Sequence, residues 1–567
     1  MIVSRNIPCP KEGEWKPSVD ISGGGTYSRI MSHSFDFAAL PPDLLRQLLL
    51  GFSGRPHLHG IANTALNHTR RPGDLYSQIA ADALLAAWAE NPLDAQCAAV
   101  LAGVAAKLPS LPPTLLPTIK SAMEHWQPDV TPEAQSAMAG DRGVQLTFLK
   151  ERLQHAPRNL FWWHHLYEFA RIHGDWSVLV SMLGNATPPE GLASLFAFTM
   201  ANGLLASGEV RAAAGTYREC LHSLPLPVGE ERLMTAWLRS GKIEKATELL
   251  RRCVEVRPWN AGLWLRLYEL KMGGASRHTP LSGRTMVLGY SYNKADDLAE
   301  TLDSLVKSDL GDAHVRILDN GSSDDTPDVI RRFVDRFGSE RAEAVTMPVN
   351  VGAPAARNWL MNLPEVRESD FAAYIDDDIS LPQDWLLRLG AAVERYPDAG
   401  VWGCKVVNHD GPARVQCGEH NLTPDKQERK DILMSTIMLQ DGDFGQADYI
   451  RPCTSVTGCV HLFRSDRLLE NGPFDLRFSP TQYDDLERDL RMVLGGGYAV
   501  YQGFLSILHK RKTGRVSQAG QVEEGNTSAN MYKLQAKYTV EEFERMAAGM
   551  DRVLLDDLMG KMKALHG

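Results

Sequence analysis

The stretch "FAAYIDDDISLPQDW" runs from Phe371 to Trp385 and joins an apolar run to three consecutive aspartates. Its first five residues are apolar or aromatic, as expected of a buried strand. Three adjacent carboxylates repel one another and raise each other's pKa values. The sequence therefore predicts a strand whose carboxyl end either faces water or holds a cation.

Strands alternate with helices around this stretch. Three earlier segments, beginning near residues 285, 314 and 342, each read as a strand followed by a helix, and "GVWGCKVV" continues the series after the aspartates. Such alternation is typical of an α/β domain with a parallel sheet. Ligands bind outside the carboxyl ends of the strands in these sheets. The residues expected at that edge are 290–293, 319–323, 350–352 and 376–378.

The polar groups at this edge indicate a nucleotide and a hard cation. Three aspartates form an oxygen-rich site that suits magnesium or manganese rather than a soft metal. Asp319 and Asn320 follow another strand and could bond a base edge, and Arg357 could meet a phosphate with two hydrogen bonds. The alternative for the aspartates is a solvated turn before the helix that follows Pro382.

Taken in order, the motifs over 284–512 resemble those of glycosyltransferase family 2, the inverting GT-A transferases. They are "LGYSYNKADDLAETLDSL", "ILDNGSSDDT", "NVGAPAARN", "YIDDDI", the segment "GPFD" followed by "DDLERDLR", and "ILHKRKTG". The resemblance implies a Rossmann-like GT-A domain with a mostly parallel sheet. It also implies transfer of a sugar, with inversion, from a nucleoside diphosphate to an acceptor hydroxyl.

The resemblance carries roles onto matching residues of this sequence. Asp378 is expected to bind Mn²⁺ or Mg²⁺ directly with the help of His509, and Asp376 or Asp377 to contact the ribose or a metal-bound water. Arg357 would steady the nucleotide. Tyr290, Tyr292 and Asp319 would hold its base, with a UDP-sugar as the favoured donor.

The general base is expected on the acidic helix. Here the sequence departs from the family pattern, because the acidic pair reads Asp484-Asp485 and the next acid is Glu487. Aligning Arg491 with the family's arginine makes Asp485 the base, and the neighbouring Asp484 leaves that choice open. The polar stretch 510–528 is a candidate lid over the diphosphate through Lys510, Arg511 or Arg515.

The region before residue 284 is predicted to be all-α. Gly174, Gly208 and Gly241 each separate two helical patterns, at spacings near the period of about 34 residues that is typical of tetratricopeptide repeats. Such repeats offer a groove to an acceptor or partner chain, or serve as a packing scaffold or an oligomer interface. The predicted organisation is a poorly ordered arm with first helices (1–72), helical repeats (73–280, clearest over 157–275), the GT-A domain (284–512), and the lid with C-terminal helices (513–567).

Composition excludes some functional classes. A net charge of −10 gives no basic footprint for nucleic acid. No apolar run approaches the roughly 20 residues of a membrane span, and eight scattered cysteines indicate neither a disulfide framework nor a zinc motif. A cytoplasmic protein is therefore expected, with peripheral membrane attachment left open, acting on a glycan, glycolipid or protein acceptor. The alternatives are a non-catalytic repeat scaffold with a degenerate transferase domain, and a GT-A-like nucleotidyltransferase.

Overall fold

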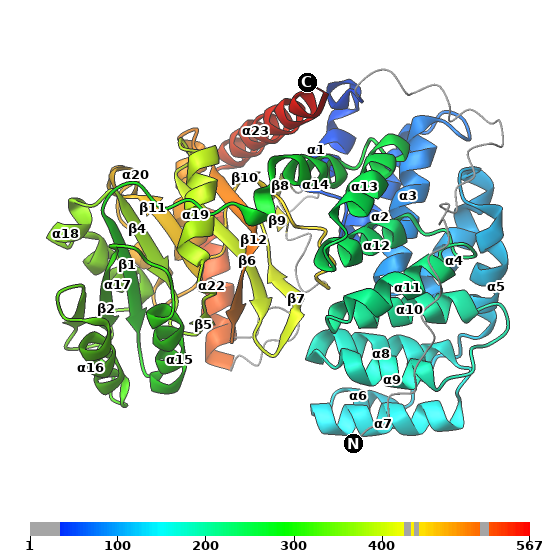
Figure 1. The fold of residues 1–567 in the computed structure, drawn as a ribbon, viewed down its shortest axis with the longest axis horizontal. Coiled ribbons are helices and arrows are strands. Elements are labelled where there is room, and N and C mark those ends of the chain that lie inside the picture. The colour runs from blue at the N-terminus through cyan, green and yellow to red at the C-terminus, as the bar shows by residue number, and fades with distance from the viewer. Residues whose placement is uncertain (1–34, 425–431, 436–441, 511–520, 567) are drawn as a thin grey trace.

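The computed structural model describes residues 35–424, 432–435, 442–510 and 521–566. Helices fill the N-terminal part of the chain, a mixed sheet with flanking helices follows, and two helices end it (Figure 1). Two predicted segments lie partly outside the described ranges. They are the arm, of which residues 1–34 are not described, and the basic end of the lid, of which residues 511–520 are not described.

The N-terminal part is all-α, as predicted. Its α-helices are α1 (Pro42–Leu50), α2 (Arg55–His68), α3 (Leu75–Glu90), α4 (Ala95–Val104), α5 (Leu116–Glu124), α6 (Pro132–Met138), α7 (Arg142–His155), α8 (Leu160–His173), α9 (Trp176–Gly184), α10 (Ala193–Ala206), α11 (Val210–Cys220), α12 (Pro227–Arg239), α13 (Ile243–Val256) and α14 (Ala261–Met272). Aspartates begin several of them. Asp74, Asp94 and Asp141 each accept a backbone N–H in the first turn of the helix that follows.

The glycines noted in the sequence lie in the turns between paired helices. Gly174, Gly208 and Gly241 have φ values of 72°, 82° and 78°, which side-chain-bearing residues rarely adopt. They join α8 to α9, α10 to α11 and α12 to α13. The helix pairs therefore recur with the spacing of these glycines.

The α/β part is built on a sheet of ten strands. The strands of this part are β1 (Thr285–Ser291), β2 (His314–Asp319), β3 (Ala342–Thr346), β4 (Phe371–Ile375), β5 (Ile379–Ser380), β6 (Val401–Asn408), β7 (Gly411–Cys417), β8 (Asn421–Pro424), β9 (Ile432–Ser435), β10 (Ile450–Cys453), β11 (Val460–Arg464) and β12 (Ala499–His509). The sheet order is β10-β12-β6-β11-β4-β1-β2-β3, with β5 beside β12 and β7 beside β6, while β8 and β9 form a separate hairpin.

Helices cover this sheet and connect its strands. They are α15 (Ala295–Val306), α16 (Thr326–Phe337), α17 (Ala353–Met361), α18 (Pro364–Arg367), α19 (Trp385–Arg395), α20 (Ser465–Glu470) and α21 (Asp484–Leu494), followed by α22 (Gln521–Lys537) and α23 (Val540–His566). Strands β4-β1-β2-β3 are parallel, and β11 runs against both β4 and β6. All of β4 is buried, as its apolar sequence predicts. The parallel strands therefore bring their carboxyl ends to one edge.

The helical and α/β parts share buried contacts. Arg451 forms a buried ion pair with Glu419 at 2.6 Å, and its other nitrogens donate to the carbonyls of Leu49 and Leu50 at the end of α1. The turn at Gly174 lies against the β6–β7 turn, where an added Cβ would come within 2.9 Å of the Asp410 carbonyl oxygen. The two parts are thus joined by both side-chain and backbone contacts.

Helix α23 lies across both parts, near α1 and α14 (Figure 1). Asp551 accepts a hydrogen bond from Arg46 of α1 at 2.6 Å, and Lys561 donates to the Ile450 carbonyl at the start of β10. Within the described ranges, no helix is long and apolar enough to cross a membrane.

Candidate functional site

The three aspartates form a tight turn after β4. Thr301, fully buried on α15, fixes this turn: its hydroxyl donates to the Asp377 and Ile379 carbonyls and accepts the Ile379 N–H. Since every bond goes to the turn's backbone, the carboxylates stay available for other partners. The aspartate run is therefore held as a site-forming turn rather than as a loose solvated loop.

Strand register brings His509 to this turn. β5 follows the aspartates directly, and its Ile379 pairs with His509 at the end of β12. The His509 Nε2 consequently lies 3.1 Å from the Asp378 Oδ1. Gln416 of β7 approaches the opposite ring nitrogen, Nδ1, at 2.6 Å. When Nδ1–H donates to the Gln416 Oε1, Nε2 can bind a cation in place of its contact with Asp378, which is the usual arrangement of a metal-binding histidine.

A lysine that we did not single out from the sequence joins the same carboxylates. The Lys294 Nζ lies 2.9 Å from Asp377 and 2.8 Å from Asp378, and Asp377 also accepts the Ser291 hydroxyl at 2.7 Å. Lys294 follows β1 in "SYNKADD", so its position after a strand end was the available signal. Its ammonium offsets the repulsion among the aspartates.

The electrostatic environments of the three aspartates differ. Burial raises the pKa of Asp376 to about 6, and burial also raises the pKa of Asp377 despite Lys294 nearby. Burial acts in the same direction on Asp378, but hydrogen bonds and charge from His509 and Lys294 outweigh it and lower its pKa. Asp378 is therefore the carboxylate held most firmly in its anionic form.

The donor atoms here fit a divalent cation. One carboxylate oxygen of Asp376, the Sγ of Cys459 and one ring nitrogen of His509 all lie within 4.8 Å of one another. Asp378 adds a carboxylate beside His509. Carboxylate oxygens with one imidazole suit manganese or magnesium. The carboxylates and the imidazole thus suit the cation expected from the sequence, whereas the Cys459 thiol is not a usual ligand of Mn²⁺ or Mg²⁺.

Arg357 connects the aspartate turn to helix α21. Its guanidinium lies 2.6 Å from Asp484 and 3.6 Å from Asp376, and the side chain is buried. The guanidinium also lies over the ring of Tyr290, 5.4 Å from the centroid. Asp484 is therefore committed to a buried ion pair, and Tyr290 packs against Arg357.

Asp485, the next residue, remains half-buried and differently bonded. The Gly458 N–H donates to its Oδ2 at 3.0 Å, and the Leu486 N–H donates to its Oδ1. Burial would raise its pKa, but the charge of Arg357 and then of His461 outweighs that effect and lowers it. Asp485 is thus the acidic side chain at the start of α21 that is both anionic and open to a ligand.

The residues expected to hold the base end the neighbouring strands. Asp319 is buried at the end of β2 and accepts the Ser322 N–H at 3.0 Å, while Tyr292 is 43% exposed. Asn320 bonds Asn350 of the loop that precedes α17 at 3.0 Å. These residues line the same edge as the aspartates. Of the expected lid cations, Lys510 is described, and it bonds Asp297 and Glu300 of α15.

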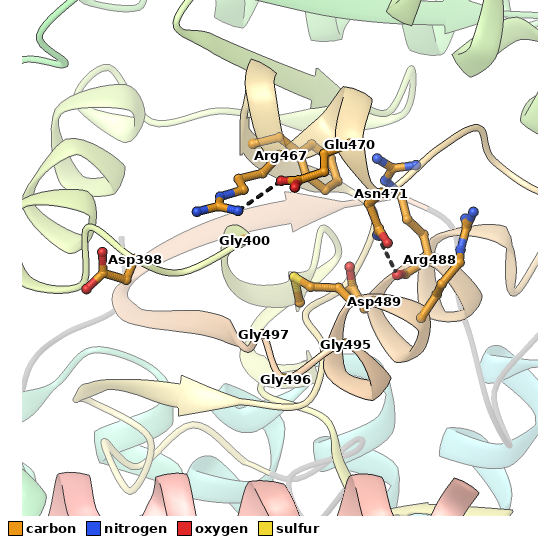
Figure 2. Close-up of a pocket in the computed structure, with 13 residues that line it drawn as sticks. Asp398, Gly400, Arg467, Glu470, Asn471, Arg488, Asp489, Gly495, Gly496 and Gly497 are labelled. Carbon is orange, nitrogen blue, oxygen red and sulfur yellow. Dashed lines mark hydrogen bonds and ion pairs between the residues drawn. The ribbon is translucent and has the colours of Figure 1, made fainter.

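A separate cavity of about 400 Å³ opens between α20 and the carboxyl end of α21 (Figure 2). Asp398 and Gly400, which precede β6, line it together with the glycine run 495–497. Some of its polar groups are paired with one another: Arg467 bonds Glu470, and Asn471 donates to the Arg488 carbonyl. Because its lining residues precede β6 and β12, whose carboxyl ends lie near the aspartate turn, the cavity lies at the opposite end of the sheet.

A family model matches a segment of the α/β part. Residues 290–445 match the family described as Glycosyl transferase family 2. This segment includes the aspartate turn, Arg357 and Asp319, whereas Asp485 and His509 lie beyond it. The α/β part thus contains a segment that matches a glycosyltransferase family, and the mostly parallel sheet between N-terminal and C-terminal helices confirms the predicted fold class.

Solved structures of transferases are distantly similar. GalNAc-T7 with UDP, GalNAc and Mn²⁺ is 12% identical, with 46% of this chain and 50% of that chain covered and a TM-score of 0.36. Staphylococcal TarS (S. aureus) is 15% identical over 40% of this chain and 36% of its own, with a TM-score of 0.29. The mannosyltransferase PcManGT from Pyrobaculum calidifontis, in complex with GDP-Man and Mn²⁺, is 16% identical, with 56% of this chain and 86% of that chain covered and a TM-score of 0.34. This chain spans half or less of the length of the first two.

Proposed function

We propose that this chain is a metal-dependent inverting glycosyltransferase that moves a sugar from a nucleoside diphosphate to an acceptor hydroxyl. One observation carries the proposal: a histidine–aspartate pair whose atoms can bind a cation and a separate half-buried carboxylate belong to one connected site. His509 and Asp378 meet at 3.1 Å, and Arg357 ties Asp376 to the helix that bears Asp485. A diphosphate donor and an acceptor hydroxyl need these two kinds of group side by side.

Asp378 and His509 are the proposed ligands of Mn²⁺ or Mg²⁺, with Asp376 in support. When bound, such a cation stabilises the negative charge of the leaving diphosphate. Gln416 orients the His509 ring, and Thr301 keeps the aspartate turn in shape. Asp376 or Asp377 is proposed to contact the ribose, and of the two Asp377 is already bonded by Lys294 and Ser291.

Asp485 is the proposed general base. An inverting displacement needs a base that removes the acceptor proton on the side opposite the leaving group. Asp484 is a poorer candidate because its carboxylate pairs with Arg357 at 2.6 Å and is buried. The lowered pKa of Asp485 keeps it deprotonated, as the role requires.

Asp319 and Tyr292 are proposed to hold the nucleotide base, with a UDP-sugar as the favoured donor. The exposed Tyr292 ring can stack on a base. Tyr290 and Arg357 would support the pocket from beneath, because each packs against the other. In this proposal Arg357 steadies the nucleotide indirectly, by fixing the position of Asp376.

The paired helices are proposed to form a tetratricopeptide-like surface for the acceptor. Turns with glycine at positive φ recur at Gly174, Gly208 and Gly241, which supports a repeated helix pair. A glycan, glycolipid or protein acceptor fits an extended concave surface of this kind. The same surface could instead join two copies of the chain.

Donor hydrolysis tests the proposal. Donors are first screened by metal-dependent thermal shift, and release of the nucleoside diphosphate is then measured with Mn²⁺ or Mg²⁺ and after chelation. We expect hydrolysis to require the cation and to be lost in Asp378→Ala and Asp485→Asn. Unchanged hydrolysis in both variants would overturn the mechanism, and no hydrolysis or transfer with any donor would favour a scaffold role.

A further inference from the structure

Cys459 lies at the aspartate turn, where the proposed function requires only oxygen and nitrogen ligands. It directly precedes β11, and its carbonyl accepts the Asp376 N–H at 3.1 Å. The next residue, Val460, pairs with Ile375, so the ladder between β11 and β4 fixes Cys459 beside Asp376. Its side chain is only 3% exposed. The backbone therefore holds this thiol at the site independently of any side-chain contact.

The thiol shares a common centre with two cation-binding groups. The Cys459 Sγ, an Asp376 carboxylate oxygen and a His509 ring nitrogen lie within 4.8 Å of one another. Two atoms that bind one zinc at about 2.0–2.3 Å can be at most about 4.6 Å apart. The three atoms thus need only a small adjustment to bind one ion, and their types are the ones that zinc prefers.

We propose that Cys459 is a thiolate ligand that gives this site selective affinity for thiophilic cations, namely Zn²⁺, Cd²⁺ and Co²⁺. The inference rests on the cation site of the proposed function. Binding replaces the S–H bond by a sulfur–metal bond and releases the thiol proton to solvent. Soft thiolates select zinc-like ions, whereas Mg²⁺ and Mn²⁺ are held mainly by oxygen.

The consequence is inhibition by thiophilic cations. An ion held by Cys459, Asp376 and His509 withdraws Asp376 and His509 from the oxygen-rich arrangement around Asp378. Zinc also prefers four ligands in a tetrahedron, which differs from the octahedral shell of magnesium. Zn²⁺ should therefore compete with Mn²⁺ and slow the reaction that Mn²⁺ supports.

Cobalt binding to the full chain provides the test. Thiolate coordination of Co²⁺ gives a sulfur-to-metal charge-transfer band in the near ultraviolet, which oxygen and nitrogen ligands do not give. We expect the wild-type protein to show the band, and Cys459→Ala and Cys459→Ser to lose it. Cys404→Ala is the matched control, because Cys404 is buried on β6, next to β11, but does not belong to the ligand group. It should keep the band.

Competition titrations against a chromophoric chelator measure the selectivity. We expect Cys459→Ser to weaken Zn²⁺ binding by more than about tenfold, in line with the loss of a metal-site interaction, and to leave Mn²⁺ binding nearly unchanged. Absence of the cobalt band in the wild type, or its persistence in both Cys459 variants, would overturn the inference. Equal weakening of Zn²⁺ and Mn²⁺ binding would overturn it as well.

The readout separates this inference from the proposed function. A cobalt band that depends on Cys459, together with no sugar transfer, supports the thiolate site and refutes the proposed activity. Mn²⁺-dependent hydrolysis without the band supports the activity and refutes the thiolate ligand.

Discussion

Replacing Gly458 by alanine should displace the carboxylate of Asp485, the proposed base, while residue 485 remains an aspartate. An added Cβ at residue 458 would lie 2.3 Å from the Asp485 Oδ2 and 3.1 Å from its Cγ. Side-chain carbons do not approach other atoms this closely, and aspartate is too short to bend away while keeping its position. The Asp485 carboxylate must therefore move, and its 3.0 Å hydrogen bond from the Gly458 N–H must lengthen.

The size of the effect follows from that displacement. Relieving the contact to an ordinary van der Waals distance requires the carboxylate to shift by about 1 Å, and such a misplacement costs about 100-fold in rate. This corresponds to about 2.7 kcal/mol in the activation free energy. Donor affinity should change little, because Asp485 is proposed to act on the acceptor and not to hold the donor.

The assay is donor hydrolysis at saturating Mn²⁺ with the donor concentration varied up to saturation, so that kcat and KM are obtained separately. We expect kcat to fall about 100-fold with KM nearly constant. Gly560→Ala, in α23, is the matched control, since an added Cβ there has nothing within 4 Å. A Gly458→Ala variant that melts like the wild type and keeps full kcat would refute the assignment of Asp485 as the base.

Three further outcomes follow from buried charges. Asp485→Asn should reduce donor hydrolysis by about 10²- to 10⁴-fold. Asp484→Asn should mainly lower the melting temperature, because it weakens the buried ion pair with Arg357. A larger loss of hydrolysis in Asp484→Asn than in Asp485→Asn would reverse the two roles. Burial raises the pKa of Asp489 to about 6 in the folded protein, compared with 3.8 in the unfolded chain. Protonation of Asp489 therefore stabilises the fold fully below pH 3.8, and this stabilisation is lost as the pH rises through about 6. In urea denaturation, the free energy of unfolding of Asp489→Asn should therefore rise by about 3 kcal/mol relative to that of the wild type between about pH 4 and pH 8. A difference in unfolding free energy that does not change with pH would contradict the prediction. Arg451→Met leaves Glu419 buried without its partner and should cost about 3–5 kcal/mol; calorimetry should still show one transition if the helical and α/β parts unfold together.

Local patterns in the sequence were enough for the fold class. The alternation of strands and helices predicted a parallel sheet, and Gly174, Gly208 and Gly241 indicated the turns between paired helices, where their φ values are positive. Both signals depend on residues close together in the chain, which interact through backbone geometry. Asp378 could also be assigned to the ligand-binding edge, because a strand directly precedes the aspartates.

The candidate site needed tertiary structure for its partnerships. Asp378 meets His509 only because β5 pairs with β12, and Asp376 meets Cys459 only because β11 runs against β4. Such registers depend on packing between segments far apart in the chain, and neighbouring residues do not encode them. The choice between Asp484 and Asp485 likewise had no local signal.

The sequence by itself thus determined which elements form and which polar residues end the strands. The tertiary structure decided which of those residues meet: it buried Asp484 against Arg357, left Asp485 half-open beside Gly458, and put Lys294 between Asp377 and Asp378. The physical reason is that the periodicity of apolar residues, which determines helices and strands, arises within a segment, whereas burial and charge pairing arise between segments.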